Sequence, residues 1–351
     1  MQHPYRSFPA RQFWGKAIAA NYNASAIADC PVPLIRRNDK VVSAGSCFAA
    51  NLIPYLERTG FHYLRTEYTH PFFKRIPPEN LSYGKFSAGY GNIYTVRQLN
   101  QLLLRALGEF HPAEDRWLVE NRYIDPFRPA LAYAARSERE FDALTAAHLR
   151  AVKRAFSGCD TFIFTLGLTE AWVSTIDGAV FPACPGTISG EYDPDRHAFA
   201  NFSVDEVMGD LRKFIVRLRE INPKVRVILT VSPVPLVATA EPKHVLSSTI
   251  YSKSVLRVAA EMAIREFADV YYFPAYEIVT GPQAPENFFE SDRRNVSQHA
   301  VDTVMGAFLS ACAASAETEV KSTNVSALVS TAGQLSAKLS DLECEEAAQA
   351  L

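Results

Sequence analysis

Short apolar runs that alternate with helical patterns are the feature that most constrains how this chain can fold. The runs span residues 40–44, 161–166, 225–231 and 270–273. Around them, apolar residues recur every three or four positions, which is typical of amphipathic helices. These helical segments span residues 48–60, 95–107, 203–221, 252–267 and 301–312. Strands that alternate with helices predict an α/β fold, in which helices cover both faces of a parallel sheet.

The remainder of the chain divides around this core. Residues 1–39 are rich in proline and arginine and predict an N-terminal arm. Residues 40–312 form the predicted domain, with an elaborated insertion at about 69–150. In the tail, residues 313–351, apolar residues recur at spacings of three and four, which resembles a short coiled coil and would allow self-association. A glycine and many serines weaken that helix and favour the alternative, an exposed tail.

Composition and cysteine spacing exclude several classes of function. The formal net charge of -2 gives no basic field for nucleic acid. No apolar run approaches the roughly 18 residues of a membrane span, and residues 1–5 lack the basic and apolar regions of a signal peptide. The six cysteines are scattered without a C-x-x-C pair, which argues against a zinc site and a disulfide framework. We therefore expect a cytoplasmic protein that needs no metal and no cofactor.

The turn after the first strand carries the strongest candidate for chemistry. Ser46 follows the strand at 40–44 and precedes a helix, so we expect it at the carboxyl edge of the sheet. Backbone N–H groups at a helix N-terminus can stabilise a developing negative charge. Ser46 is therefore a candidate nucleophile, and the alternative is that its hydroxyl only caps the helix. The thiol of Cys47 is another candidate nucleophile, although a small buried residue is the favoured interpretation.

Further loops are expected at the same edge of the sheet. They carry Gly91, Asn92, Thr169, Glu170, His244 and Asp292. Together with Ser46 they supply a hydroxyl, amides, carboxylates and a histidine. Acyl transfer needs these parts: a nucleophile, a base with an orienting carboxylate, and donors to the oxyanion.

The stretch from Gly45 to Ala49 reads Gly-Ser-Cys-Phe-Ala, and together with further stretches it resembles the GSCFA family. Those stretches span 13–14, 90–95, 125–129, 165–172, 184–187, 232–235 and 251–257, within a resemblance from about residue 4 to 310. The family is similar to the SGNH esterases and lipases, which have a flavodoxin-like three-layer α/β/α fold. The resemblance implies transfer or hydrolysis of acyl groups, often acetyl groups on carbohydrates, with Ser46 as nucleophile and Gly91 as an oxyanion donor.

The chain departs from the SGNH pattern in three blocks. In the first, Gly45 directly precedes Ser46, without the aspartate that the pattern places between them. Where the third SGNH block has an asparagine, this chain has Thr169, so Asn92 is expected to take over as an oxyanion donor beside the hydroxyl of Thr169. Where the last block has a histidine base three residues after an aspartate, this chain has Asn295 after Asp292. These departures put the base, and catalysis with it, in question.

Three histidines are candidates for the missing base: His244, His299 and His70. We prefer His244, because it lies in the loop after the strand at 225–231, on the expected active edge. Asp292 or Glu170 would orient the base, although either carboxylate can instead pair with a nearby cation. The alternative for a lone loop histidine is a surface residue or a structural hydrogen bond.

The sequence thus predicts a serine esterase or O-acyltransferase that acts through an acyl-enzyme on Ser46. The resemblance alone implies that its substrate is an acylated, in particular acetylated, carbohydrate or glycoconjugate. In that enzyme a histidine ring nitrogen should lie within hydrogen-bond reach of the Ser46 hydroxyl. Trp172 would stack on a sugar ring, or else belong to the core. The alternative function is a catalytically inactive glycan-binding or scaffolding protein, which the missing histidine and asparagine favour.

Overall fold

The described part of the chain includes most of the predicted domain. The structure is a computed structural model, and it describes residues 3–20, 22–28, 30, 32–68, 85–131 and 133–313. For Cys47 and Ala313 it describes the backbone only. His70, the first part of the expected insertion and the apolar stripe of the tail lie outside the described residues, so those expectations stay predictions.

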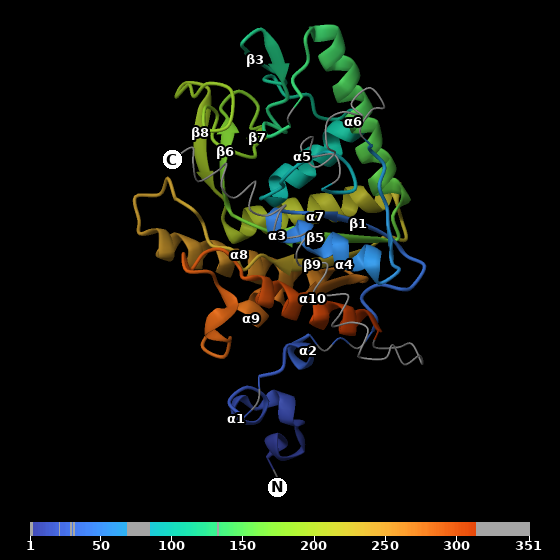
Figure 1. Cartoon of the computed structure of the whole chain (residues 1–351), viewed down its shortest axis with the longest axis vertical. Coiled ribbons are helices and arrows are strands. Elements are labelled where there is room, and N and C mark those ends of the chain that lie inside the picture. The colour runs from blue at the N-terminus through green and yellow to red at the C-terminus, as the bar shows by residue number, and fades with distance from the viewer. Residues whose placement is uncertain are drawn as a thin grey trace.

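A parallel five-stranded sheet forms the centre of the molecule (Figure 1). Its strands are β1 (Lys40–Ala44), β2 (His62–Tyr63), β5 (Thr161–Leu166), β9 (Arg226–Val231) and β10 (Val270–Phe273). Their spatial order is β10-β9-β5-β1-β2, and each neighbouring pair is parallel. Numbered along the chain, this is the order 2-1-3-4-5 of flavodoxin-like sheets. The predicted α/β fold of flavodoxin type is therefore confirmed.

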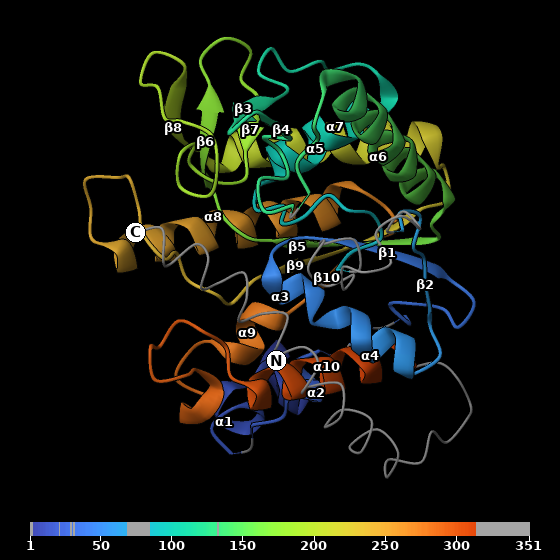
Figure 2. The same ribbon diagram turned by 45° about the horizontal axis from the view of Figure 1, so that its top comes forward.

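Helices cover both faces of this sheet and complete the three layers, as Figure 2 shows. One face carries α5 (Val96–Leu107), α6 (Glu138–Gly158), α7 (Val204–Ile221) and α8 (Val245–Glu266). The other carries α3 (Cys47–Ala50), α4 (Leu52–Arg58), α9 (Ala275–Val279) and α10 (Gln298–Ala313). Every position of β5 and β9 is buried, which explains why these strands read as continuous apolar runs without alternation.

Helix boundaries follow local signals in the sequence. Ser203 forms the expected capping box at the start of α7. The helical segment after β1 is irregular, as expected, and breaks at Asn51 into α3 and α4. Pro54 has no N–H to bond the carbonyl group four residues earlier, which accounts for the break. Helix α8 starts earlier than its apolar pattern predicts, because His244 caps it at Val245.

A second, antiparallel sheet projects from the carboxyl edge of the central sheet, and the sequence analysis did not anticipate it. It contains β6 (Glu170–Ser174), β7 (Val180–Phe181) and β8 (His197–Asn201), in the order β7-β6-β8. A separate hairpin, β3 (Trp117–Val119) and β4 (Arg122–Ile124), packs beside it. Phe181 contacts the rings of Trp117 and Phe127, with centroids 5.8 and 5.7 Å away, and this small cluster joins the two.

The N-terminal arm divides into an exposed and a buried part. Its exposed part contains short helical turns and α1 (Trp14–Ala17), which lies at one end of the molecule (Figure 1). Its second part contains α2 (Ala24–Ile27), followed by Leu34 and Ile35, which are buried in the core.

Among the described helices, none combines the length and the apolar character that a membrane crossing requires.

Candidate active site

Ser46 lies in the tight turn that joins β1 to α3. Gly45 before it has a φ of +149°, and a Cβ there would lie 2.7 Å from the Cβ of Ala49 and 2.8 Å from that of Thr165. Glycine is therefore required in this turn. The hydroxyl of Ser46 does not cap α3. It is 3% exposed, and its Oγ has no hydrogen-bond partner among the described residues.

A cavity of about 460 Å³ opens at the carboxyl edge of the sheet, and Ser46 lines it. Its walls come from the loop at 89–95, the segment at 127–131, the second sheet and the loop that follows β9. Of the other residues expected at the site, Gly91, Asn92 and Glu170 line the cavity with Ser46. Thr169, His244 and Asp292 are not among its lining residues.

The loop that carries Gly91 and Asn92 is fixed beside the nucleophile turn. The carbonyl oxygen of Gly45 accepts the N–H of Ile93 at 2.8 Å. Asn92 Nδ2 donates to the Tyr94 hydroxyl at 3.1 Å, and Gly91 takes a φ of +65° at the bend. The loop therefore brings a backbone N–H and a side-chain amide to the same cavity as the Ser46 hydroxyl, where both can donate to an oxyanion.

A second backbone segment of the cavity wall, Gly167 and Leu168, is held by α8. Their N–H groups donate to the carbonyl oxygen of Tyr94, at 3.2 and 2.9 Å. Lys253 Nζ donates to the carbonyl oxygen of Gly167 at 2.7 Å. The sequence analysis did not single out Lys253, although it occupies a core-facing position of α8, just before the buried Leu256. A charged residue on the apolar face of an amphipathic helix is the sequence signal that could have identified Lys253.

Thr169 has a structural position. Its side chain is fully buried, and its hydroxyl donates to Asn201 Oδ1 at 2.7 Å. Its N–H donates to the hydroxyl of Ser252 at 3.0 Å. These two bonds connect the residue just before β6 to β8 and to α8, at the point where the chain leaves the central sheet. Thr169 therefore has no free hydrogen to offer an oxyanion in the cavity.

The structure does not bring His244 to Ser46. The imidazole of His244 is exposed at the N-terminus of α8, and its Nδ1 accepts the N–H of Leu246 at 3.2 Å. His299 is also exposed, with its ring against Phe288 in the first turn of α10. Within the described residues no histidine lines the cavity. The expected contact between a histidine and the Ser46 hydroxyl is thus not formed there.

Asp292 closes a turn instead of facing a base. Its Oδ1 accepts the N–H groups of Arg294 and Asn295, both at 2.9 Å, and its Oδ2 accepts the Asn295 side-chain amide at 2.8 Å. This turn directs Arg294 to the cavity wall. The Nε of Arg294 is buried and has no hydrogen-bond partner in the described part of the chain. The last family block therefore contributes a cation to the cavity, which the sequence analysis did not foresee.

Glu170 is the carboxylate that lines the cavity, as far as the described residues show. Its Oε1 accepts the hydroxyl of Thr239 at 2.7 Å. Burial raises the pKa of the Glu170 carboxyl, and the bond from Thr239 opposes that shift. A carboxyl with a raised pKa in a cleft is suited to proton transfer. Burial also raises the pKa of the Cys184 thiol on the cavity wall, which disfavours a thiolate nucleophile there.

A buried charged cluster holds the first residue of the loop at 89–95. Glu67 Oε2 accepts hydrogen bonds from the N–H of Gly89 and from His148 Nδ1, both at 2.7 Å. Arg128 donates to Asp125 Oδ2 at 2.9 Å and, at 3.5 Å, to the carbonyl oxygen of Gly89. Both backbone groups of Gly89 are therefore held by side chains of this cluster.

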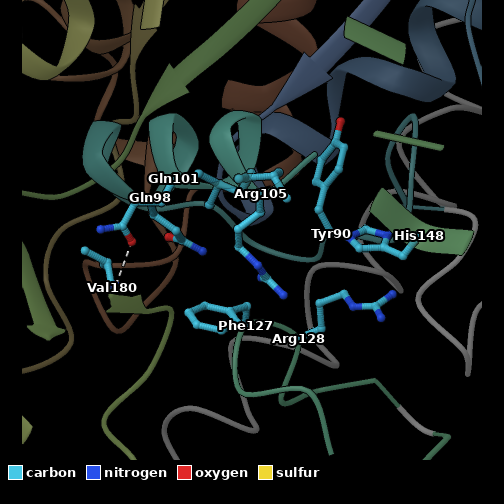
Figure 3. Close-up of a pocket in the computed structure, with 10 residues that line it drawn as sticks. Tyr90, Gln98, Gln101, Arg105, Phe127, Arg128, His148 and Val180 are labelled. Carbon is cyan, nitrogen blue, oxygen red and sulfur yellow. Dashed lines mark hydrogen bonds between the residues drawn. The ribbon is translucent and has the colours of Figure 1, made fainter. Parts of the chain in front are cut away.

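The electrostatics of this cluster favour a neutral histidine beside charged partners. Burial and the charge of Arg128 lower the pKa of His148. Burial raises the pKa of Glu67, but the interactions with His148, Arg128 and Gly89 outweigh it and hold that pKa at about 2. Figure 3 shows Arg128 and His148 beside a cavity of about 20 Å³, large enough for one water but not for a substrate. The cluster therefore has a positioning role.

The fold and the site define the class of this protein: a flavodoxin-like α/β protein with a serine at the strand-to-helix turn of its first strand. The chain belongs to the GSCFA family, whose model matches residues 40–308. The family resemblance seen in the sequence is thus confirmed. In the described part of the chain, no three histidine, cysteine or acidic side chains gather as metal ligands would.

Comparison with known proteins adds little beyond the family. None of the curated proteins matches this sequence. Among solved structures, the chain is similar to a Clostridium thermocellum family 3 carbohydrate esterase at 9% identity and a TM-score of 0.33, covering 77% of this chain and 93% of that one. A likeness this distant carries no argument about activity.

Proposed function

We propose that this protein is an ester hydrolase or acyltransferase with Ser46 as its nucleophile. The observation that carries the proposal is Ser46, which lines a large cavity at the end of a central strand and whose buried Oγ has no hydrogen-bond partner in the described residues. A buried hydroxyl without a partner costs about 1–3 kcal/mol. The presence of such a hydroxyl is explained if the substrate supplies its hydrogen-bond partner. Membership in the GSCFA family, which resembles the SGNH esterases, supports the same chemistry.

The proposed reaction proceeds through an acyl-enzyme. Ser46 Oγ attacks the ester carbonyl carbon, and its proton passes through one water to the Glu170 carboxylate. The Gly91 N–H and Asn92 Nδ2 donate to the oxyanion of the tetrahedral intermediate. Collapse of the intermediate breaks the bond to the leaving alcohol, which takes the proton from Glu170. Water or a second hydroxyl then attacks the acyl group, and Ser46 recovers its proton. His244, His299 and Asp292 have no part in this scheme.

We further propose that the leaving alcohol is a carbohydrate or glycoconjugate. Trp172 lines the cavity and contacts Tyr192 and Phe199, with ring centroids 5.3 and 5.9 Å away, so its orientation is fixed. Such a fixed aromatic side chain can pack against the apolar face of a sugar ring. Thr187 and Thr239 on the same wall can bond to its hydroxyls. The free thiols of the described cysteines fit the reducing cytoplasm that we propose as its compartment.

A second candidate function is ligand binding without catalysis. Its support is that no histidine among the described residues lines the cavity, and that none of these residues places a base within hydrogen-bond reach of Ser46 Oγ. In that case the cavity would hold an acylated glycan, and the two arginines on its wall would contribute to affinity. The two functions differ in one property, the chemical reactivity of the Ser46 hydroxyl.

The decisive experiment combines turnover of p-nitrophenyl esters with labelling by a fluorophosphonate, read by intact mass and peptide mapping. The esterase predicts labelling on Ser46, and loss of both labelling and turnover in Ser46→Ala. Ser248→Ala is the matched control. Ser248 is also a buried serine whose Oγ has no partner among the described residues, but it does not line the cavity. That variant should retain both activities.

Further variants separate the remaining assignments. Cys47→Ser should keep its turnover, whereas a thioester mechanism predicts that it loses it. Glu170→Gln should lose turnover, and His70→Gln tests a histidine outside the described residues. Absence of labelling and of turnover for every ester, with Ser46→Ala binding an acylated glycan as well as the wild type does, would replace the esterase by the binding function.

A further inference from the structure

The walls of the cavity beside Ser46 are far more apolar than an acetyl group requires. The loop after β9 contributes Val234, Pro235, Leu236, Val237 and Ala238. The opposite walls contribute Phe127, Pro129, Ala130, Leu131, Trp172, Phe181, Pro182, Ile188 and Phe199. A wall of this kind gains free energy when it covers aliphatic carbon.

The size of the cavity also exceeds what an acetyl group fills. About 10–15 Å³ of such space holds one water, whereas this cavity measures about 460 Å³. It falls within the roughly 300–1,000 Å³ range of sites that enclose a whole small-molecule ligand. Ser46 lies on its wall, so an acyl group attached to Ser46 Oγ has the remaining volume available for its chain.

The charged side chains on the described cavity wall have polar partners, except that the Nε of Arg294 has none among the described residues. Among the described residues, Glu170, Arg128 and Arg294 are the charged side chains on the wall. Arg128 is ion-paired with Asp125 at 2.9 Å, and Glu170 is bonded to Thr239. Towards solvent the apolar lining continues, because Ile188 and Val237 both line the cavity and are 38% and 44% exposed. A chain longer than the enclosed part can therefore extend along the mouth.

We propose that the cavity binds an unbranched aliphatic acyl chain, so that the protein acts on medium-chain acyl esters in preference to acetyl esters. This inference rests on the proposed esterase function and specifies the acyl half of its substrate. Each methylene that enters the cavity should raise kcat/KM by up to about fourfold, which corresponds to about 0.8 kcal/mol per buried CH₂. The gain should stop once the chain emerges at Val237.

The test compares kcat/KM for the acetate, butyrate, octanoate and laurate esters of p-nitrophenol. We expect a steep rise from acetate to octanoate and little gain beyond it. In Val237→Glu, a charge at the mouth should reduce the octanoate rate about tenfold or more, and by a larger factor than it reduces the acetate rate. The matched control is Val216→Glu on α7, since Val216 is 46% exposed and does not line the cavity. A profile that is flat or highest for acetate overturns the inference while the esterase stands.

A binding measurement distinguishes failure of the inference from failure of the proposed function. The fluorescence of 11-(dansylamino)undecanoic acid is titrated with Ser46→Ala, which binds without turnover. Saturable binding that is weakened by Val237→Glu but not by Val216→Glu supports the acyl site. If the wild type then cleaves no ester, only the proposed esterase function is refuted. If the probe does not bind, or binds equally to both glutamate variants, the acyl site is refuted whatever the turnover.

Discussion

Lys253 Nζ donates a hydrogen bond to the carbonyl oxygen of Gly167 at 2.7 Å, from a side chain that is only 1% exposed. Gly167 follows β5, and Ser46 follows β1, which pairs with β5 so that Ala44 lies opposite Phe164. An ammonium group withdrawn from water is costly unless it is well bonded. The lysine therefore fixes the backbone that lies beside the nucleophile, and its ammonium group remains stably buried only while the Gly167 carbonyl oxygen stays in this position.

Replacement of this lysine should impair the chemical step more than substrate binding. In Lys253→Met the Gly167 carbonyl loses its donor, and a buried acceptor without a partner costs about 1–3 kcal/mol. We expect a lower Tm and a loss of kcat of about tenfold or more, with KM little changed because Lys253 does not line the cavity. Lys213→Met, at an exposed lysine of α7, is the control. Equal kcat values in the two variants would contradict this role.

Gly45 should not tolerate a side chain. In Gly45→Ala the new Cβ meets the Cβ atoms of Ala49 and Thr165 at 2.7 and 2.8 Å, and the φ of +149° adds strain. Strain and overpacking together should reduce the free energy of unfolding by about 2–4 kcal/mol and displace Ser46. Urea denaturation and fluorophosphonate labelling measure the two effects.

A second glycine provides the control for that substitution. Gly209 lies inside α7, and a Cβ there would have no atom within 4 Å. Gly209→Ala should therefore stabilise the protein by about 0.5–1 kcal/mol through helix propensity. If Gly45→Ala were as stable and as reactive as Gly209→Ala, the turn would not depend on glycine as the geometry implies.

Much of the central fold could be predicted because its signals are local. The apolar runs, the capping box at Ser203 and the irregular helix around Pro54 each depend on residues a few positions apart. The second sheet was missed although Asp177-Gly178, between β6 and β7, is a recognised hairpin signal. Its strands are short and only partly buried, so their apolar pattern is weak.

The site was predictable where a residue's position follows from a strand end, as for Ser46, or from the family resemblance, as for Gly91. The choice of His244 relied on loop position alone, and the sequence does not reveal that the imidazole caps its own helix. The position of Arg294 on the cavity wall depends on the orientation of a turn, and the contact of Lys253 with Gly167 depends on the rotation of α8. Tertiary packing decides both.

The buried cluster around Gly89 should make the protein sensitive to acid in two steps. His148 has a lowered pKa in the folded chain, so the unfolded chain binds its proton first, and stability should fall as the pH drops below about 6.5. Glu67 has a pKa of about 2 when folded, so its contribution is present above about pH 4.3 and is lost as the pH falls toward 2.

Thermal unfolding as a function of pH checks this prediction. His148→Gln should be less stable at neutral pH and should lose the first step, whereas His111→Gln, at an exposed histidine, should retain it. Glu67→Gln leaves Arg128 and Gly89 with a weaker partner, and breaking a buried pair in this way costs about 3–5 kcal/mol. An identical pH dependence in wild type and His148→Gln would show that the acid sensitivity arises elsewhere.

The rate of ester cleavage should depend on the ionisation of Glu170. If its carboxylate takes the proton of Ser46, kcat/KM rises with pH as Glu170 ionises, and burial places this rise above the usual range of a glutamate. Thr239 donates to the carboxylate and thereby lowers the pKa of Glu170. Thr239→Val should therefore shift the acid limb of the pH–rate profile to higher pH, and Glu170→Gln should reduce the rate by about 10²–10⁴-fold. An acid limb that Thr239→Val leaves in place would assign the proton transfer to another group.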